Sequence, residues 1–374
     1  MKMLWDAAGI LSASKFVKRG IECLRNNDLA CALESFTQAI ERAPKSFEGY
    51  FNRGLVYIVQ RNADKAIEDF SHAIRLNKDS ANAYCQRGIA YNLRKDYASA
   101  LNDLNKALTL DPQSVVAYFH RGKTYVCLDK LDLAIFDYTM ALILKPNHIE
   151  ALLNRGGAFM EKNDLENAKA DFNDAISRKP NYALAYICRA RLKTRQDLTD
   201  DAIADYSEAI RLNPSKGLTA YSYHDRAVNY AKRGEVEKSK EDYQAAIRLK
   251  PDLLQAHFNL GCTYIELNDF EKAIEAFAEV VRMNPEHLAA HYNRGSLYHQ
   301  RNQHSAAIDD FTQVVRIDPN YVCGYYWRGL AYAAQENYEL AISDYDQALR
   351  IDPNMAEADE MKEHLRVWQQ LLKK

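Results

Sequence analysis

Apolar and small residues recur along the chain three or four positions apart, and the whole pattern repeats every 34 residues. Gly54, Gly88, Gly122 and Gly156 show this period directly. Each repeat contains two amphipathic segments separated by a short polar segment, which predicts two helices joined by a turn. A period of this length is typical of helical hairpins that bury their apolar faces against their neighbours. The chain is therefore predicted to form an all-α solenoid.

Ten repeats and one insertion account for residues 13–355. The insertion, residues 217–219, separates the sixth repeat from the seventh and is expected to produce a kink or hinge between them. The predicted repeats are 13–46, 47–80, 81–114, 115–148, 149–182, 183–216, 220–253, 254–287, 288–321 and 322–355.

Recurring residue types support these boundaries. All nine prolines fall at the thirty-second position of a repeat. Because proline cannot continue a helix, it marks the end of the second helix. Most repeats have Gly at the eighth position, where it costs about 0.5–1 kcal/mol relative to Ala, so a close approach of the second helix is expected there. Large residues, mostly Phe and Tyr, recur on both helices and are predicted to fill the core.

The two ends of the chain do not fit the repeat. Residues 1–12 are predicted to form a short N-terminal cap helix over the first repeat; the alternative is that the sequence begins inside an earlier repeat. Residues 356–374 are predicted to form a C-terminal capping helix, which a solenoid needs to cover its last apolar layer. Its apolar face is formed by Met361, Leu365, Trp368 and Leu372.

The pattern aromatic-x-x-Gly-x-x-Tyr, followed by Ala, Phe or Tyr, Ala and Pro, resembles the tetratricopeptide repeat family, in a form with Arg before the Gly. The segment Tyr325-Tyr326-Trp327-Arg328-Gly329 is one example, and the resemblance covers most of the chain. It implies antiparallel helix pairs stacked into a right-handed superhelix whose first helices line the concave face. It also implies binding to other proteins, without catalytic machinery or cofactors.

Arg precedes the eighth position in nine repeats, and Asp precedes the large residue of the second helix in eight. Every repeat that has the Asp also has the Arg, whereas pairing each Asp with the following repeat would leave Asp242 opposite Leu260. The sequence therefore predicts an Arg–Asp ion pair within each repeat.

Charge and composition exclude several functions. Lys and Arg number 49 and Asp and Glu number 51, so the basic footprint of a nucleic-acid-binding protein is missing. No apolar run is long enough to span a membrane. Seven cysteines at irregular spacings suggest free thiols in a reducing compartment, and the predicted location is cytoplasmic; an effector exported without a cleaved signal would look the same.

No metal, cofactor or catalytic site is predicted. His287 and His291 have the spacing of zinc ligands on a helix, but the glutamate of the H-E-x-x-H motif is missing. His257 and His291 occupy an aromatic core position and are interpreted as core or surface histidines. There is no phosphate-binding glycine loop, and no nucleophile beside an evident base.

The predicted partner-binding surface lies on the first helices. The resemblance places outward side chains of the concave face at the second, fifth, ninth, twelfth and thirteenth positions, which are mostly apolar in the first four repeats. Exposed apolar surface of this kind marks an interaction site, unless tight coiling or residues 1–12 cover it. The predicted contact residues are Phe51, Leu55, Ile58, Ile89, Phe119, Lys123, Leu153, Ile187, Arg191, Arg195, Lys232, Phe258, Tyr292 and Tyr326.

Two polar features modify this prediction. Arg191, Arg195 and Lys232 form a basic cluster that could receive an acidic segment or a chain terminus; a solvated surface is the alternative. Asparagines at the sixth position resemble those that hold peptide backbones in some relatives. They are Asn52, Asn154, Asn259 and Asn293.

These observations predict a non-enzymatic scaffold or adaptor that binds a protein or peptide segment in its concave groove. No repeat has the Lys–Asn combination of the chaperone-binding relatives. The alternative is a structural assembly subunit that forms oligomers through its ends or outer face, and the sequence leaves the oligomeric state open.

Overall fold

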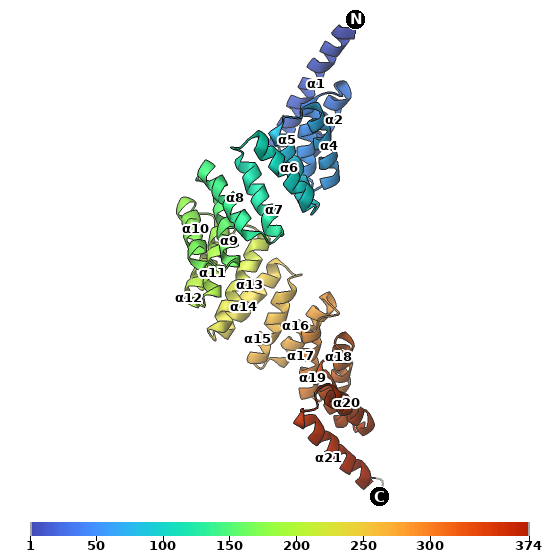
Figure 1. Ribbon diagram of the computed structural model, residues 1–374. Coiled ribbons are helices and arrows are strands. Elements are labelled where there is room, and N and C mark those ends of the chain that lie inside the picture. Colours follow the sequence, from blue (N-terminus) through green and yellow to red (C-terminus); the bar gives the residue numbers. More distant parts are fainter. Residues whose placement is uncertain (1, 373–374) are drawn as a thin grey trace. The chain divides into compact units, whose positions relative to one another are not determined.

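The computed structural model describes the backbone of residues 2–372 and the side chains of residues 13–367 (Figure 1). Residues 2–372 form helices and turns, with no strand. The chain divides into two compact parts, an N-terminal array (Met1–Asn181) and a C-terminal array (Tyr182–Lys374). In each array, consecutive helices pack against each other as hairpins. The predicted all-α solenoid class is confirmed.

The N-terminal array contains ten helices. They are α1 (Lys2–Arg25), α2 (Leu29–Arg42), α3 (Phe47–Val59), α4 (Ala63–Leu76), α5 (Ala81–Leu93), α6 (Tyr97–Leu110), α7 (Val115–Cys127), α8 (Leu131–Leu144), α9 (Ile149–Glu161) and α10 (Leu165–Arg178).

The C-terminal array contains eleven. They are α11 (Ala183–Arg195), α12 (Thr199–Arg211), α13 (Lys216–Lys232), α14 (Val236–Leu249), α15 (Leu254–Glu266), α16 (Phe270–Met283), α17 (Leu288–Gln300), α18 (His304–Ile317), α19 (Val322–Ala334), α20 (Tyr338–Ile351) and α21 (Ala356–Leu372).

The turn inside each hairpin follows local chemistry. A residue with positive φ lies just after the end of most first helices; Asn27, Arg61 and Lys95 are examples. Such a left-handed residue redirects the chain at a helix end. The next residue frequently caps the second helix: the Asp28 carboxylate accepts a hydrogen bond from the Cys31 amide, and Asp96 does the same for Ser99. Short polar segments therefore reverse the chain at each repeat.

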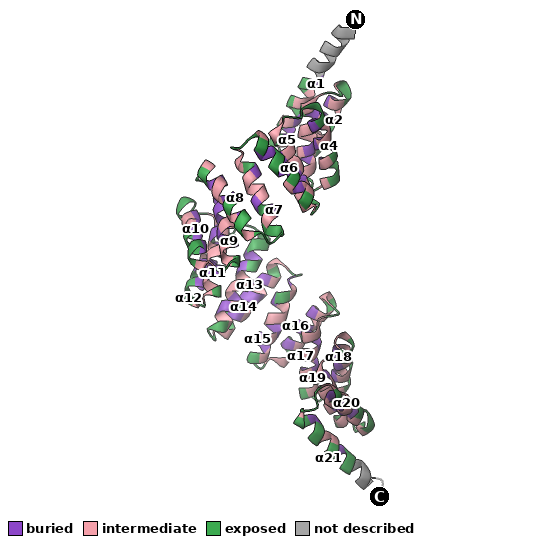
Figure 2. Ribbon diagram, viewed as in Figure 1, coloured by how far each residue is buried: buried purple, intermediate pink, exposed green. Residues whose placement is uncertain are grey.

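In most hairpins the core contains a glycine facing a large side chain, usually an aromatic ring. A Cβ atom on Gly122 would lie 2.7 Å from Cε1 of Tyr138, and Tyr138 is completely buried. The equivalent rings Phe36 and Phe70 are also fully buried and meet the same small position. The predicted close approach of the second helix is confirmed, and the large ring explains why the helix tolerates glycine. Figure 2 shows buried residues along the helix faces that meet.

The termini differ in part from the prediction. Instead of a separate cap helix before Ala13, α1 continues through the predicted boundary, because residues 11–15 contain neither proline nor glycine to end it. The predicted packing of side chains 1–12 lies outside the described residues. At the other end, Ala358 and Leu365 of α21 are buried, and Met361 packs with them against α20. The predicted contacts of Trp368 and Leu372 lie outside the described side chains.

The insertion at 217–219 lengthens a helix. These residues lie in the first turns of α13, which begins at Lys216 with Ser215 as its cap. The extra residues are therefore absorbed as helix rather than as an open loop. The predicted kink beside α13 stays a prediction, as does the division of the chain into ten repeats.

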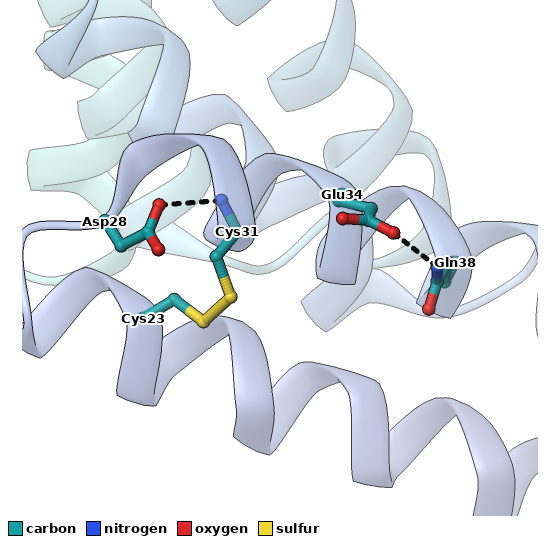
Figure 3. The surroundings of a disulfide bond; sticks show 5 residues. All are labelled: Cys23, Asp28, Cys31, Glu34 and Gln38. Carbon is teal, nitrogen blue, oxygen red and sulfur yellow. Dashed lines mark hydrogen bonds between the residues drawn. A yellow bond between two sulfur atoms is a disulfide. The ribbon is translucent and has the colours of Figure 1, made fainter.

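Cys23 and Cys31 form a disulfide bond (Figure 3). Cys23 lies near the end of α1 and Cys31 near the start of α2, with their Cα atoms 5.8 Å apart. The prediction of free thiols is wrong for this pair, because the tight turn between the helices brings the two side chains together. The free cysteines are Cys85, Cys127, Cys188, Cys262 and Cys323.

Candidate binding surface on the first helices

Eight Arg–Asp ion pairs hold the first helix of a repeat to its second helix. In the pair of α7 and α8, Nε of Arg121 donates to Oδ2 of Asp137 at 2.8 Å, and Nη2 donates to Oδ1 at 2.7 Å. Two hydrogen bonds therefore join the side chains, and the predicted ion pair within the repeat is confirmed. The remaining pairs are Arg53–Asp69, Arg87–Asp103, Arg155–Asp171, Arg189–Asp205, Arg226–Asp242, Arg294–Asp310 and Arg328–Asp344.

Six of these arginines also donate a hydrogen bond to the preceding repeat, a contact that sequence reasoning missed. Nη1 of Arg121 donates to Oδ1 of Asn105 at 2.7 Å, and Nη1 of Arg87 donates to Oγ of Ser71 at 3.0 Å. The signal is a polar residue two positions after the Asp of the preceding repeat. It is Ser, Thr or Asn in most repeats that precede such an Arg. Arg294 lacks this signal because Ala278 stands there. The arginines thus join neighbouring hairpins and are not available for a ligand phosphate.

Predicted contact residues of the N-terminal array are only partly on the surface. The ring of Phe51 meets the buried Phe70 edge-on, with centroids 5.8 Å apart. Leu55 and Ile58 pack against the same core cluster, and Ile89 packs against the next one. These side chains are half-buried, so one part of each supports the core and the other part faces outward.

Phe119 and Lys123 form a small mixed site on α7. The Phe119 ring lies 5.9 Å from the Tyr138 ring and 4.9 Å from the His148 ring. The Lys123 ammonium lies 5.8 Å from the Phe119 centroid and is exposed. Burial lowers the pKa of the neighbouring His120 to about 4, with Lys123 adding a smaller repulsion. His120 is therefore neutral at neutral pH.

A more exposed apolar row lies at the ends of these helices. Val59 ends α3 and Leu93 ends α5, and both side chains are exposed. Val116 and Val126 are exposed on α7. These exposed side chains occupy positions at which the sequence predicts an apolar contact surface, and their role in binding stays a prediction.

Two predicted contact residues are wrong. Leu153 is 5% exposed and Ile187 is 2% exposed. Ile187 belongs to a core cluster with Ala190, Tyr206 and Ala209. The fifth position of a repeat points partly toward the second helix, so a branched aliphatic side chain there is drawn into the core.

The basic cluster of the C-terminal array is largely paired with acids. Nε of Arg191 donates to Oδ2 of Asp225 at 3.2 Å, and the Lys232 ammonium donates to Asp197 at 3.0 Å. The other oxygen of Asp225 bonds His224 at 2.9 Å. Arg195 is exposed. Sequence reasoning listed the cations but overlooked these two acids, and their pairing leaves less positive charge for an acidic segment.

A cavity of about 310 Å³ adjoins this cluster. It is lined by Arg191, Thr194, Tyr206, Asp225 and Val228. The polar atoms around it already bond each other: Thr194 and Asn229 share hydrogen bonds of 3.0 and 3.2 Å. The hydrogen bonds between Thr194 and Asn229 therefore leave these polar groups of the cavity wall already paired.

Three predicted aromatic residues continue along the C-terminal array in one recurring arrangement. Each packs on the large ring of its own second helix: Phe258 on Phe277, Tyr292 on Phe311 and Tyr326 on Tyr345, with centroids 5.6, 6.1 and 6.0 Å apart. They are half-buried. Their outward edges are the part that a partner could touch.

The asparagines at the sixth position behave differently from one another. The amides of Asn52 and Asn154 donate to the carbonyls of Glu48 and Glu150 in their own helices. The amide of Asn259 contacts Nε2 of His224 at 3.2 Å. Asn293 is half-buried on α17.

The histidine pair is explained by the fold. Nδ1 of His291 bonds Asp310 at 2.7 Å, and its Nε2 bonds the Pro285 carbonyl at 3.1 Å. His287 caps α17 by accepting from the Ala290 amide. The interpretation of His291 as a satisfied core histidine is confirmed.

Comparison with family models gives matches to tetratricopeptide repeats over most of the chain. Two models described as tetratricopeptide repeat match residues 17–81 and 258–322, and 81–114 and 322–355. A third, described as TPR repeat, matches 229–266, and a fourth tetratricopeptide model matches 149–182. Together these matches span more than half of the residues. A search of curated proteins finds no match.

Solved structures with the same fold are distant in sequence. A tetratricopeptide repeat protein from Parabacteroides merdae is 21% identical, with 68% of this chain and 99% of that chain covered and a TM-score of 0.55. PilF of Pseudomonas aeruginosa is 17% identical, with 57% and 97% covered and a TM-score of 0.50. YrrB, a TPR protein described as having an unusual peptide-binding site, is 24% identical, with 51% and 97% covered and a TM-score of 0.47. These likenesses concern the fold alone. No helix among the described residues is long and apolar enough to cross a membrane.

Proposed function

Because the chain belongs to the tetratricopeptide repeat family, we propose that it is a non-enzymatic scaffold or adaptor that binds a segment of another protein on its first helices. The observation that carries this proposal is the exposed apolar row of the N-terminal array, with Val59 and Leu93 as its most regular members. They occupy the same position in successive repeats, 34 residues apart. Regularly spaced apolar side chains suit a segment that runs across several repeats.

The chemistry of the surface defines the segment. In the N-terminal array the outward groups are mostly apolar or aromatic. Lys123 lies beside Phe119, and Glu48 and Glu150 are exposed at the second position of their repeats. In the C-terminal array, Asp225 and Asp197 pair with Arg191 and Lys232. The proposed ligand is therefore a predominantly apolar extended or helical segment, with an affinity near micromolar, or about −8 kcal/mol. An acidic peptide would find less complementary charge.

The test compares partner binding by three forms of the intact protein. Val59→Glu with Leu93→Glu places charge in the proposed surface. Leu340→Glu on α20 makes the same change at an exposed apolar site on a second helix. Partners that are captured by the wild type and by Leu340→Glu but lost from the double variant support the proposal. Partners retained by the double variant contradict it.

A cytoplasmic location and the lack of enzymatic activity are further parts of this proposal. The Cys23–Cys31 disulfide makes the location testable, since the cytosol keeps most thiols reduced. The structure joins Cys23 to Cys31, so the proposed cytoplasmic location implies that cellular reductants open this bond. Trapping thiols in intact cells should then find both cysteines reduced. An oxidised pair would instead favour an oxidising compartment or export.

A further inference from the structure

The outward face of α8 carries an exposed apolar stripe, which we define as Leu133, Phe136, Met140 and Ile143. The first, second and fourth of these side chains are 47%, 57% and 66% exposed, and Met140 is half-buried. The opposite face of the same helix holds Ala134, Tyr138 and Ala141, which are completely buried in the core. The α8 stripe therefore lies outside the packing of its own hairpin.

The other repeats show that the fold does not require this stripe. At the equivalent positions α4 has Lys65, Glu68, His72 and Arg75, and α16 has Lys272, Glu275, Glu279 and Arg282. These helices have the same length as α8 and bury residues of the same kind at the same positions: Ala66, Phe70 and Ala73 on α4, and Ala273, Phe277 and Val280 on α16. Large exposed apolar surface on one helix alone has no folding role and is typical of an interaction site.

The spacing of the stripe suits another helix. Its members are three, four and three residues apart, which is the a/d pattern by which two helices pack side by side. From Leu133 to Ile143 the stripe extends about 15 Å along α8. A partner helix with the same spacing would cover all four side chains.

Most outward residues of the flanking helices α6 and α10 are uncharged. α6 presents Ser99, Asn102, Lys106 and Thr109, and α10 presents Asn167, Ala170, Asp174 and Ser177. Lys106 and Asp174 occupy the same repeat position as Met140, one on each side of the α8 stripe. Asp174 also pairs with Arg178 of its own helix, with Nε and Oδ1 2.7 Å apart. Lys106 is thus the basic group on one edge of the stripe, and Asp174, shared with Arg178, is the acidic group on the other edge at the same level.

We propose that the α8 stripe binds the α8 stripe of a second copy of this chain, with the two helices parallel. A twofold axis along α8 places α6 of one copy opposite α10 of the other, so Lys106 faces the partner subunit's Asp174, and the reverse contact forms by symmetry. An axis perpendicular to α8 would place Lys106 opposite the partner subunit's Lys106. The repulsion between the two Lys106 ammonium groups disfavours the antiparallel arrangement, whereas the parallel one lets Lys106 share Asp174 with Arg178. A stable dimer buries about 800 Å² on each partner, which requires the rims on α6 and α10 in addition to the stripe.

The first experiment is sedimentation velocity of the intact chain over a range of concentrations up to about 100 micromolar. The wild type is expected to form a dimer. Phe136→Glu should raise its dissociation constant at least about thirtyfold, as is usual for a central apolar contact. Ile143→Lys is a second variant at a more exposed site. Ala204→Glu is the matched control, because Ala204 is exposed at the equivalent position of α12 and should leave the dimer unchanged.

The second experiment reverses the rim charges. Lys106→Asp and Asp174→Lys should each weaken the dimer, and the double variant should restore it, because the opposite charges face each other again. Circular dichroism confirms that each variant is folded. A wild type that stays monomeric, or a dimer indifferent to both Phe136→Glu and Ile143→Lys, overturns the proposal. A double variant weaker than either single variant overturns the parallel arrangement.

Discussion

Replacing Arg121 by Leu should destabilise the protein much more than replacing Arg121 and Asp137 together. The Asp137 side chain is 1% exposed and the Arg121 side chain 17% exposed. In the single variant both carboxylate oxygens lose their donors and the charge stays buried. Removing one member of a buried pair costs about 3–5 kcal/mol, whereas exchanging both members for apolar residues is frequently close to neutral.

The pKa of Asp137 supports this magnitude. Burial raises the pKa of Asp137 above its ordinary value, although the hydrogen bonds from Arg121 lower it. The carboxylate is thus charged in a place that disfavours charge, and only its partner compensates. In the double variant the loss should be limited to the hydrogen bond with Asn105 and the contacts of the guanidinium with Tyr118 and Tyr125, at 5.6 and 5.9 Å.

Guanidinium unfolding followed by circular dichroism measures the effect, together with hydrogen exchange of α7 and α8, because repeat arrays can unfold in parts. The control is Lys162→Leu, which breaks the exposed ion pair with Asp132 and should cost about 0–1 kcal/mol. Equal losses in the Arg121 single and double variants would refute the reasoning.

Three further predictions concern the core. The buried Tyr138 hydroxyl has no hydrogen-bond partner, so Tyr138→Phe should stabilise the protein by about 1 kcal/mol. Tyr243→Phe should destabilise it by about the same amount, because the Tyr243 hydroxyl bonds Ser239 and Asn259. The opposite order of the two variants in thermal unfolding would contradict this. Folding lowers the pKa of His120 to about 4, so below pH 6.5 the unfolded chain binds more protons than the folded chain. The free energy of unfolding should therefore fall by at most about 3 kcal/mol as the pH is lowered from 6.5 to 4. His120→Gln should make this pH dependence less steep, and an unchanged pH dependence would refute the lowered pKa of His120. Gly122→Ala should cost about 1–3 kcal/mol through its clash with the Tyr138 ring, while Gly157→Ala, with open space around its Cβ, should stabilise by about 0.5–1 kcal/mol; similar effects of the two changes would show that the ring can move.

The repeat made the fold predictable because one packing problem is solved many times in the same sequence. Proline at the end of the second helix and Gly opposite a large ring define the hairpin, and the Arg–Asp pairing followed from comparing repeats. The predicted end of a separate cap helix at Ser12 was wrong. The 34-residue pattern begins at the next residue, but no residue there ends a helix. The disulfide was missed because the spacing of Cys23 and Cys31 carries no signal unless the turn geometry is known.

The surface was harder to predict than the core. The same position on the first helix can be half-buried in one repeat and fully buried in another, as Phe51 and Ile187 show. The acids Asp197 and Asp225 neutralise cations from the neighbouring repeat, and this depends on distances between helices. The α8 stripe was readable in the sequence, since no other second helix has large apolar residues at all four equivalent positions. The family resemblance, however, indicated the first helices as the binding surface.

The most direct test of the proposed function is hydrogen–deuterium exchange of the intact chain with and without a captured partner. Binding to the first helices predicts slower exchange in α3, α5 and α7, and no such protection when Val59→Glu with Leu93→Glu is used. Protection confined to the second helices, with α3, α5 and α7 unchanged, would contradict the proposal.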